Sequence, residues 1–178
     1  MKPLITLLIS LLFIASCSQD NSVDSGNRTG MLQLFLTDKP IALKEVWVTI
    51  TDIQVHKTGE NWINFDANGH SVDLLTLKNR EQLLQSAPLQ AGKYTGIRLE
   101  VTDGHIIDAA GNRCDLKIPS GKVEIPMNFD INTESNAEIV LDFGADKSVQ
   151  VTQTGHNQQC ILRPVIEAQF ASQPGSNP

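Results

Sequence analysis

The sequence predicts an all-β domain, an antiparallel β-sandwich with one short helix. Three observations lead to this prediction. Short runs alternate apolar and polar residues, Gly, Asn and Asp separate these runs, and a single brief segment has helical spacing. The domain is expected at residues 31–170, a length typical of a single folded unit.

The alternation is clearest in two runs near the start of the domain. In residues 31–37 the leucines share one side of the predicted strand. In residues 45–56 the apolar positions slip by one near Thr51 and Asp52, which predicts a β-bulge or a bend. Further strands are predicted at residues 94–101, 123–131, 137–143 and 159–170.

Turn residues and one helical segment complete the predicted fold. Residues 66–69 (Asp-Ala-Asn-Gly) and 108–111 (Asp-Ala-Ala-Gly) each predict a hairpin turn, in which Gly adopts a positive φ and Asp accepts backbone N–H bonds. A calcium loop beginning at Asp66 is the alternative for the first turn, but histidine is a poor calcium ligand and the Gly is misplaced for an EF-hand. Residues 77–86 are predicted to form the short helix.

The N-terminus is predicted to be a lipoprotein signal peptide. Lys2 precedes an apolar stretch, residues 4–15, that is shorter than the roughly 20 residues of a membrane span. Residues 14–17 (Ile-Ala-Ser-Cys) resemble a bacterial lipobox, in which the cysteine receives a lipid and becomes the new N-terminus after cleavage. An ordinary secretory signal peptide is the alternative. We therefore assign residues 1–16 to the signal peptide and Cys17 to lipidation.

The segment that follows is predicted to be a flexible tether. Residues 17–30 are rich in Ser, Asn, Asp and Gly, and they contain too few apolar residues to order themselves. A coil of this length spans roughly 20 Å. Ser18 replaces the aspartate that retains enterobacterial lipoproteins at the inner membrane, so we expect a lipid-anchored protein of the cell envelope, at the outer membrane if the host is Gram-negative. Residues 171–178 are predicted to be a disordered tail.

The charge of the chain excludes one class of partner. Among 178 residues, 14 are Lys or Arg and 20 are Asp or Glu, which gives a net charge of −6. No cluster of basic residues offsets this acidity, whereas nucleic-acid binding depends on positive charge. We expect no nucleic-acid partner, and we expect the membrane to be contacted through the lipid anchor.

Cys114 and Cys160 are the two cysteines that remain beyond the lipobox. In an oxidising compartment such a pair predicts a disulfide bond. Two buried free thiols and a metal-binding pair are the alternatives, and His156, four residues before Cys160, is only weak support for a metal.

Several motifs occur in the order in which a known family has them. They are GMLQLFLTDKP (30–40), NWINF, SVDLLTL, LQAGKYTGIRLEV, DLKIPSG (115–121), LDFGADKSV and ILRPVI. Together they resemble the bacterial lipoprotein domain of unknown function DUF4382, from about Gly30 to Ile166. The resemblance implies an envelope β-sandwich related to carbohydrate-binding-like and transthyretin-like folds, and it implies no activity. Gly144 departs from the family pattern, which often has a second Asp there.

The sequence contains no arrangement of residues that is typical of catalysis. Nucleophile-elbow, zinc-protease and phosphate-loop motifs are absent, and the four histidines do not pair at ligand spacing. Ser120, in Pro-Ser-Gly, is better explained by a turn than by a nucleophile. We therefore expect no enzyme activity. The remaining alternative is a glycoside hydrolase using paired carboxylates among Asp38, Asp52, Asp103, Asp142 and Asp146.

We expect instead a non-catalytic binding module whose ligand is a carbohydrate or an envelope polymer. Trp47 is predicted on the outer face of its strand, where an aromatic ring can stack on a sugar or anchor a protein. The alternative is that the second sheet or the short helix covers this tryptophan. Trp62 is predicted in the core. Tyr94 and Arg98 are predicted to share one strand face with Glu100 and to form a second candidate patch. A structural subunit that docks another envelope protein is the alternative function.

One cofactor is left open by the sequence. Asp142 and Asp146 flank a predicted turn, and their carboxylates are of the type that calcium prefers. We expect no other cofactor.

Overall fold

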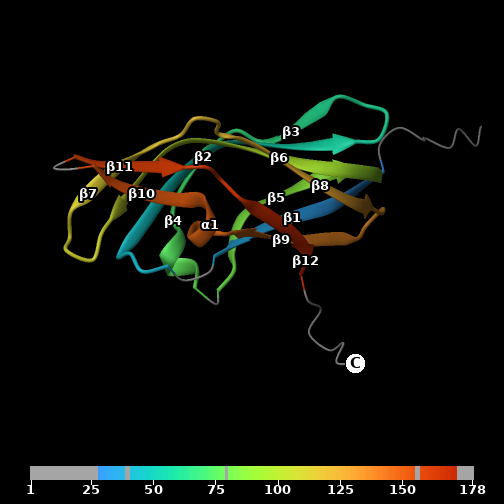
Figure 1. Ribbon diagram of the computed structural model, residues 1–178. Helices are drawn as coiled ribbons and strands as arrows, with labels where there is room; N and C mark the ends of the chain where they lie inside the picture. Colours follow the sequence, from blue (N-terminus) through green and yellow to red (C-terminus); the bar gives the residue numbers. More distant parts are fainter. Residues whose placement is uncertain (1–27, 39–40, 79, 155–156, 172–178) are drawn as a thin grey trace, which may run out of the picture.

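The chain forms two β-sheets packed face to face. The structure is a computed structural model that describes residues 28–38, 41–78, 80–154 and 157–171. Figure 1 shows the two layers, with β1, β5, β9 and β12 in one and the longer strands β2 and β6 in the other. The predicted all-β sandwich is confirmed. The predicted signal peptide, Cys17, most of the tether and nearly all of the tail lie outside the described residues.

The strands fall where the sequence alternates, and the two helical segments are a single turn each. The 3₁₀ helix η1 (Leu74–Leu77) and the α-helix α1 (Ala145–Ser148) are short connections. The strands of the described residues are β1 (Thr29–Thr37), β2 (Glu45–Lys57), β3 (Trp62–Asp66), β4 (His70–Asp73), β5 (Gln82–Gln90), β6 (Gly92–Ile107), β7 (Arg113–Lys117), β8 (Lys122–Ile131), β9 (Asn136–Phe143), β10 (Val149–Thr154), β11 (Asn157–Leu162) and β12 (Ile166–Phe170).

Among the named strands of the described residues, the pairing is antiparallel except for two pairs. The smaller sheet has the order β12-β9-β1-β5, and the larger has the order β10-β11-β7-β6-β2-β3, with β4 also paired to β2 and β8 to β6. The pairs β1–β9 and β7–β11 are parallel. Alternation alone predicts a strand but not its direction, because the direction depends on which distant strand becomes its neighbour.

The larger sheet has two ends, because its central strands change partners along their length. The second half of β2 pairs with β3 and the first half of β6 pairs with β8, and we call this region the β3–β8 end. The first half of β2 pairs with β4 and the second half of β6 pairs with β7, and we call this region the β4–β7 end. One long pair of strands therefore presents two separate outer surfaces.

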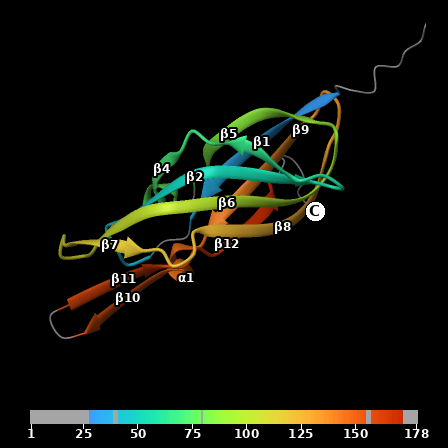
Figure 2. The same ribbon diagram turned by 90° about the horizontal axis from the view of Figure 1, so that it is seen from above.

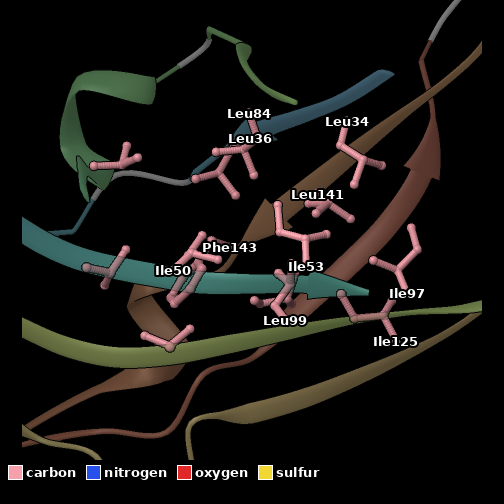
Figure 3. Close-up of a cluster of buried hydrophobic side chains, with 14 of the residues drawn as sticks. Leu34, Leu36, Ile50, Ile53, Leu84, Ile97, Leu99, Ile125, Leu141 and Phe143 are labelled. Carbon is pink, nitrogen blue, oxygen red and sulfur yellow. The ribbon is translucent and has the colours of Figure 1, made fainter. Parts of the chain in front are cut away.

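The hydrophobic core lies between the two sheets. Leu34 of β1, Leu141 of β9, Ile50 of β2 and Ile97 of β6 are fully buried and come from both layers. Figure 3 shows these side chains converging from the facing sheets. Burying a side chain of this size stabilises the fold by roughly 1.5–3 kcal/mol, so this layer fixes which face of each strand points outward.

The local features predicted for the turns and for β2 are confirmed. The register between β2 and β6 shifts around Ile50, where the apolar pattern slips. Gly69 and Gly111 have positive φ angles of 77° and 93°. In the two turns, Asp66 accepts a hydrogen bond from the backbone of Asn68 and Asp108 accepts one from the backbone of Asn112.

The predicted helix at residues 77–86 is wrong. Residues 82–90 instead form β5, which pairs with β1 along its whole length. Residues 77–86 would make fewer than about three helical turns, and helices this short depend on tertiary packing for their stability. Pairing with β1 therefore outweighs the local preference. Among the described residues, no helix has both the length and the apolar character that a membrane span requires.

The predicted disulfide is confirmed and fastens a hairpin to the sandwich. Cys114 of β7 is bonded to Cys160 of β11 across 46 residues. The parallel pairing of β7 with β11 covers only Leu116 and Lys117 on the β7 side. Figure 2 shows the β10–β11 hairpin projecting beside β7 at one end of the molecule. The covalent bond therefore supplements a short backbone ladder.

Candidate functional site

The outer face of the β3–β8 end carries two rows of side chains that cross four strands. Strand pairing aligns β3, β2, β6 and β8 at this end. One row consists of Asn64, Gln54, Arg98 and Glu124, and the next consists of Trp62, His56, Gly96 and Pro126. Residues that are distant in the sequence thus form one continuous surface.

Trp62 and Arg98 are the centre of this surface. The guanidinium carbon of Arg98 lies 3.9 Å from the centre of the Trp62 ring, which is a cation–π contact. The Nε and Nη2 atoms of Arg98 donate hydrogen bonds of 3.1 and 2.5 Å to the same carboxylate oxygen of Glu124. A third bond of 3.1 Å runs from Nη1 to Gln54. Four contacts from three strands therefore fix the arginine over the indole.

Gly96 and His56 complete the surroundings of the indole. A Cβ atom at Gly96 would lie 3.3 Å from the Trp62 ring, so the missing side chain lets the ring approach the β6 backbone closely. The rings of His56 and Trp62 have centres 5.1 Å apart. His56 Nδ1 and Thr95 Oγ1 are hydrogen-bonded at 2.7 Å. The position of the indole is thereby set before any ligand arrives.

A hollow of about 320 Å³ opens beside the indole. We call it the Trp62 hollow. It is lined by His56, Trp62, Thr95, Gly96, Glu124 and Pro126. Small-molecule sites typically occupy about 300–1,000 Å³ and combine apolar surface with a few polar groups. The hollow has this size and composition.

A polar network extends from the hollow along β2 and β3. Asp52 accepts hydrogen bonds from Gln54 at 2.7 Å and from Asn64 at 3.0 Å. Gln54 in turn accepts from Arg98. Since each side chain holds the next, the donors and acceptors around Trp62 are held in fixed directions.

Trp47 lies on the outer face as predicted, but at the other end of the sheet. Its indole N–H donates a 2.7 Å hydrogen bond to Glu45, and its ring stacks on His105 at 6.2 Å between centres. Asp73 nearby accepts backbone hydrogen bonds from Val46 and Leu75. The groups around Trp47 therefore bind one another.

Tyr94 does not share a face with Arg98, so this part of the prediction is wrong. Tyr94 is buried in the core, where its ring stacks on Phe129 with centres 5.1 Å apart and its hydroxyl donates to the backbone of Gln90. Burial, and after it the charge of Glu60, raises the pKa of Tyr94. The register between β6 and β8 shifts between Tyr94 and Gly96. This bulge reverses the alternation, which places Arg98 outside and Tyr94 inside.

The prediction that Trp62 lies in the core is wrong, because its side chain is on the outer face of β3. In β3, Trp62 and Asn64 alternate with Ile63 and Phe65. The exposed Asn64 shares the phase of Trp62, whereas Phe65 is buried. That alternation was the available indication of an outward Trp62. His56 and Glu124 carried no comparable pattern, because their importance depends on pairing between distant strands.

Asp142 and Asp146 were the two residues considered for calcium binding. Among the described residues, no group of three or more His, Cys, Asp or Glu side chains is arranged to hold a metal ion. Asp142 lies within β9, opposite Thr37 and Glu167 of the neighbouring strands, while Asp146 is exposed in α1. The two carboxylates belong to different surroundings.

The Asp66 turn joins the two ends of the outer face. Asp66 is almost completely buried at the end of β3, and its carboxylate is hydrogen-bonded to the ring of His70 and accepts a hydrogen bond from the side-chain amide of Asn68. Burial acts to raise the pKa of Asp66, but the hydrogen bonds from His70 and Asn68 outweigh it and lower the pKa below its usual value. Asp66 therefore has a structural role, because its carboxylate oxygens are hydrogen-bonded within its own turn.

The chain was compared with known protein families, curated proteins and solved structures. The family described as "Domain of unknown function (DUF4382)" matches residues 29–164. No curated protein matches the chain, and no solved structure matches it.

Proposed function

Since the chain belongs to the DUF4382 family, a domain of unknown function, we propose its role from the outer face itself: a non-catalytic, carbohydrate-binding module of the cell envelope. The observation that carries the proposal is the Trp62 indole, which Arg98 holds beside the Trp62 hollow. A sugar has an apolar C–H face and a polar edge, so it needs an aromatic surface beside fixed hydrogen-bonding groups. Trp62 supplies the first, and His56, Thr95 and Glu124 supply the second.

The hydrogen bonds of Glu124 and His56 favour a binding role for these side chains over a catalytic role. The Glu124 carboxylate is held by two bonds from Arg98, and His56 is bonded to Thr95. These contacts fix orientation, and pre-organised groups of this kind lower the entropic cost of binding. A protein partner is the competing occupant of the same face, and the test below includes it.

The experiment compares the two tryptophans. Wild-type protein, Trp62→Ala and Trp47→Ala are applied to an array of immobilised glycans and, in parallel, to envelope extracts for capture of protein partners. We expect glycan binding by the wild type, a loss of about 30-fold or roughly 2 kcal/mol for Trp62→Ala, and no change for Trp47→Ala. Capture of a protein through Trp62 without glycan binding would replace the proposal with protein docking.

We propose further that a lipid on Cys17 holds the module at a membrane of the envelope, the outer membrane in a Gram-negative host. This proposal is supported by the lipobox-like residues 14–17 and the polar segment after them. Two or more acyl chains anchor a protein stably, whereas one does not. Labelling cells with an alkyne fatty acid should mark the wild type and not Cys17→Ala. An unlabelled wild type contradicts the anchor and leaves the binding proposal untouched.

A further inference from the structure

Building on the proposed function, we infer that the Trp62 hollow is the middle of a groove for a neutral, linear glycan several sugars long. Three hollows lie along β8 and adjoin one another. The Trp62 hollow shares Glu124 with a second hollow of about 340 Å³ and Thr95 with a third of about 370 Å³. A single sugar would occupy one hollow and leave its neighbours empty.

The three hollows follow one another along an edge strand. The second is lined by Pro119, Ser120, Lys122, Glu124, Arg163 and Pro164, at the beginning of β8. The third is lined by Thr58, Lys93, Thr95, Asn128, Phe129 and Asp130, at its end. In the described part of the chain the backbone of β8 pairs with β6 alone, so its other edge carries no strand pairing there. At about 3.3 Å per residue, β8 is roughly 30 Å long, which suits an extended polymer.

The lining of the groove is suited to sugars along its whole length. Trp62, Pro119, Pro126 and Pro164 provide flat apolar surfaces at intervals. Phe129 is an apolar residue of the third hollow. Hydroxyl or amide groups line all three hollows: Ser120 the second, Thr95 the Trp62 hollow and the third, and Thr58 and Asn128 the third. Each hollow therefore combines apolar with hydrogen-bonding surface, which is the combination that each sugar of a polysaccharide requires.

The charges of the groove are arranged in opposite pairs, which favours a neutral ligand. Across β6 and β8, Lys93 lies opposite Asp130, Arg98 opposite Glu124, and Glu100 opposite Lys122. Arg163, at the far end, donates to Gln150. A uniformly anionic chain would meet a carboxylate beside three of these four cations, whereas a neutral chain needs no such match of charges. Binding should then depend little on salt.

The test measures affinity against chain length. The full-length protein, in a zwitterionic detergent without a sugar headgroup, is titrated calorimetrically with neutral gluco-, manno- and xylo-oligosaccharides of about one to six units. We expect at least one series in which the affinity rises about tenfold or more between two units and six. We also expect this affinity to change less than about twofold between 0.05 and 0.5 M salt.

Variants at the two ends of the groove separate it from a single-sugar site. Ser120→Trp and Asn128→Trp place bulk in the outer hollows, and both positions are exposed. We expect each to weaken six-unit binding about five- to tenfold and to leave two-unit binding unchanged. Gln169→Trp, at an exposed position of the smaller sheet, is the matched control.

Three results overturn the inference, and each is distinct. Equal affinity for short and long oligosaccharides means that Trp62 forms a single-sugar site, so the groove fails while the proposed function stands. Binding only to acidic glycans, with a steep salt dependence, contradicts the neutral ligand. Binding to no glycan of any length contradicts both the groove and the proposed function.

Discussion

The two tryptophans of the chain lie on the same outer sheet face, but the groups around them differ. At the β4–β7 end, Trp47 has its indole N–H bonded to Glu45 and its ring stacked on His105. At the β3–β8 end, Trp62 is held by Arg98 beside a hollow of about 320 Å³. The first ring contributes to the internal contacts of the protein, and the second lies at the edge of an accessible space.

An outward aromatic residue is not by itself a binding site. What distinguishes Trp62 is a glycine beneath the ring, fixed polar neighbours and a space of ligand size next to it. Trp47 is close to the features that hold the sheet together, since its register partner His105 lies opposite Asp115, next to Cys114. The β4–β7 end is therefore structural, and the β3–β8 end is the candidate for recognition.

The largest effect is expected when the covalent bond of the structural end is removed. Replacing both cysteines, Cys114→Ser with Cys160→Ser, opens a loop of 46 residues and should lower the free energy of unfolding by about 3–4 kcal/mol. Denaturant melts measure this loss. Ligand affinity of the folded variant should stay at the wild-type value, because the Trp62 hollow contains neither cysteine. A variant that keeps its stability but loses binding would reverse the roles of the two ends.

Trp47 is expected to contribute to stability and not to recognition. Trp47→Ala removes a stacked ring pair and a hydrogen bond to a carboxylate, and should lower the free energy of unfolding by about 1–2 kcal/mol. Trp47→Phe keeps an aromatic ring and removes only the bond to Glu45, so its loss should be smaller. Equilibrium unfolding by denaturant separates the two terms. A Trp47→Ala variant that melts like the wild type would leave Trp47 available for a ligand.

The fold was predictable from sequence because apolar residues alternate with polar ones along the strands, and the apolar ones form the buried layer. Leu32, Leu34 and Leu36 alternate in one run and are all fully buried, and the slip near Thr51 appears as a register shift. The segment at 82–90 was not predictable in the same way. The helix was predicted at residues 77–86, of which residues 82–86 belong to β5, and only pairing with the distant strand β1 makes them a strand.

The candidate site was less predictable, because it depends on bulges and on neighbours across strands. Tyr94, Gly96 and Arg98 would share a face in a regular strand, but the bulge after Tyr94 turns it inward. Arg98 is in β6 and Trp62 is in β3, and β2 lies between these two strands. The two side chains meet only because β2 pairs with each strand in a particular register. The register between distant strands cannot be deduced from one sequence. The sequence therefore indicated Arg98 as a site residue but not its contact with Trp62.

The Asp66 turn, which connects the two ends, should make stability sensitive to acid. The folded pKa of Asp66 lies below its unfolded value of 3.8, so the carboxylate contributes stability above pH 3.8 and loses it as the pH falls through the folded pKa. Asp66→Asn should cost about 1 kcal/mol at neutral pH and should remove this part of the acid dependence. The measurement is the difference in unfolding free energy between the two proteins from pH 7 downward. A difference that does not shrink in acid contradicts the assigned role.

The smallest expected effect tests whether Arg98 positions Trp62. Arg98→Lys keeps the charge but loses the planar group that stacks on the indole and bonds twice to Glu124. In a Trp47→Phe background Trp62 is the only tryptophan, since the chain has two, so its fluorescence reports on this ring alone. We expect stronger quenching of Trp62 by acrylamide and an affinity loss of about two- to fivefold, equivalent to about 0.5–1 kcal/mol. Arg113→Lys alters a comparable ion pair with Asp115 at the β4–β7 end and is the matched control. Unchanged quenching in Arg98→Lys would mean that Gly96 and His56 suffice to hold the ring, and the distinction between the two ends would then depend on the hollow alone.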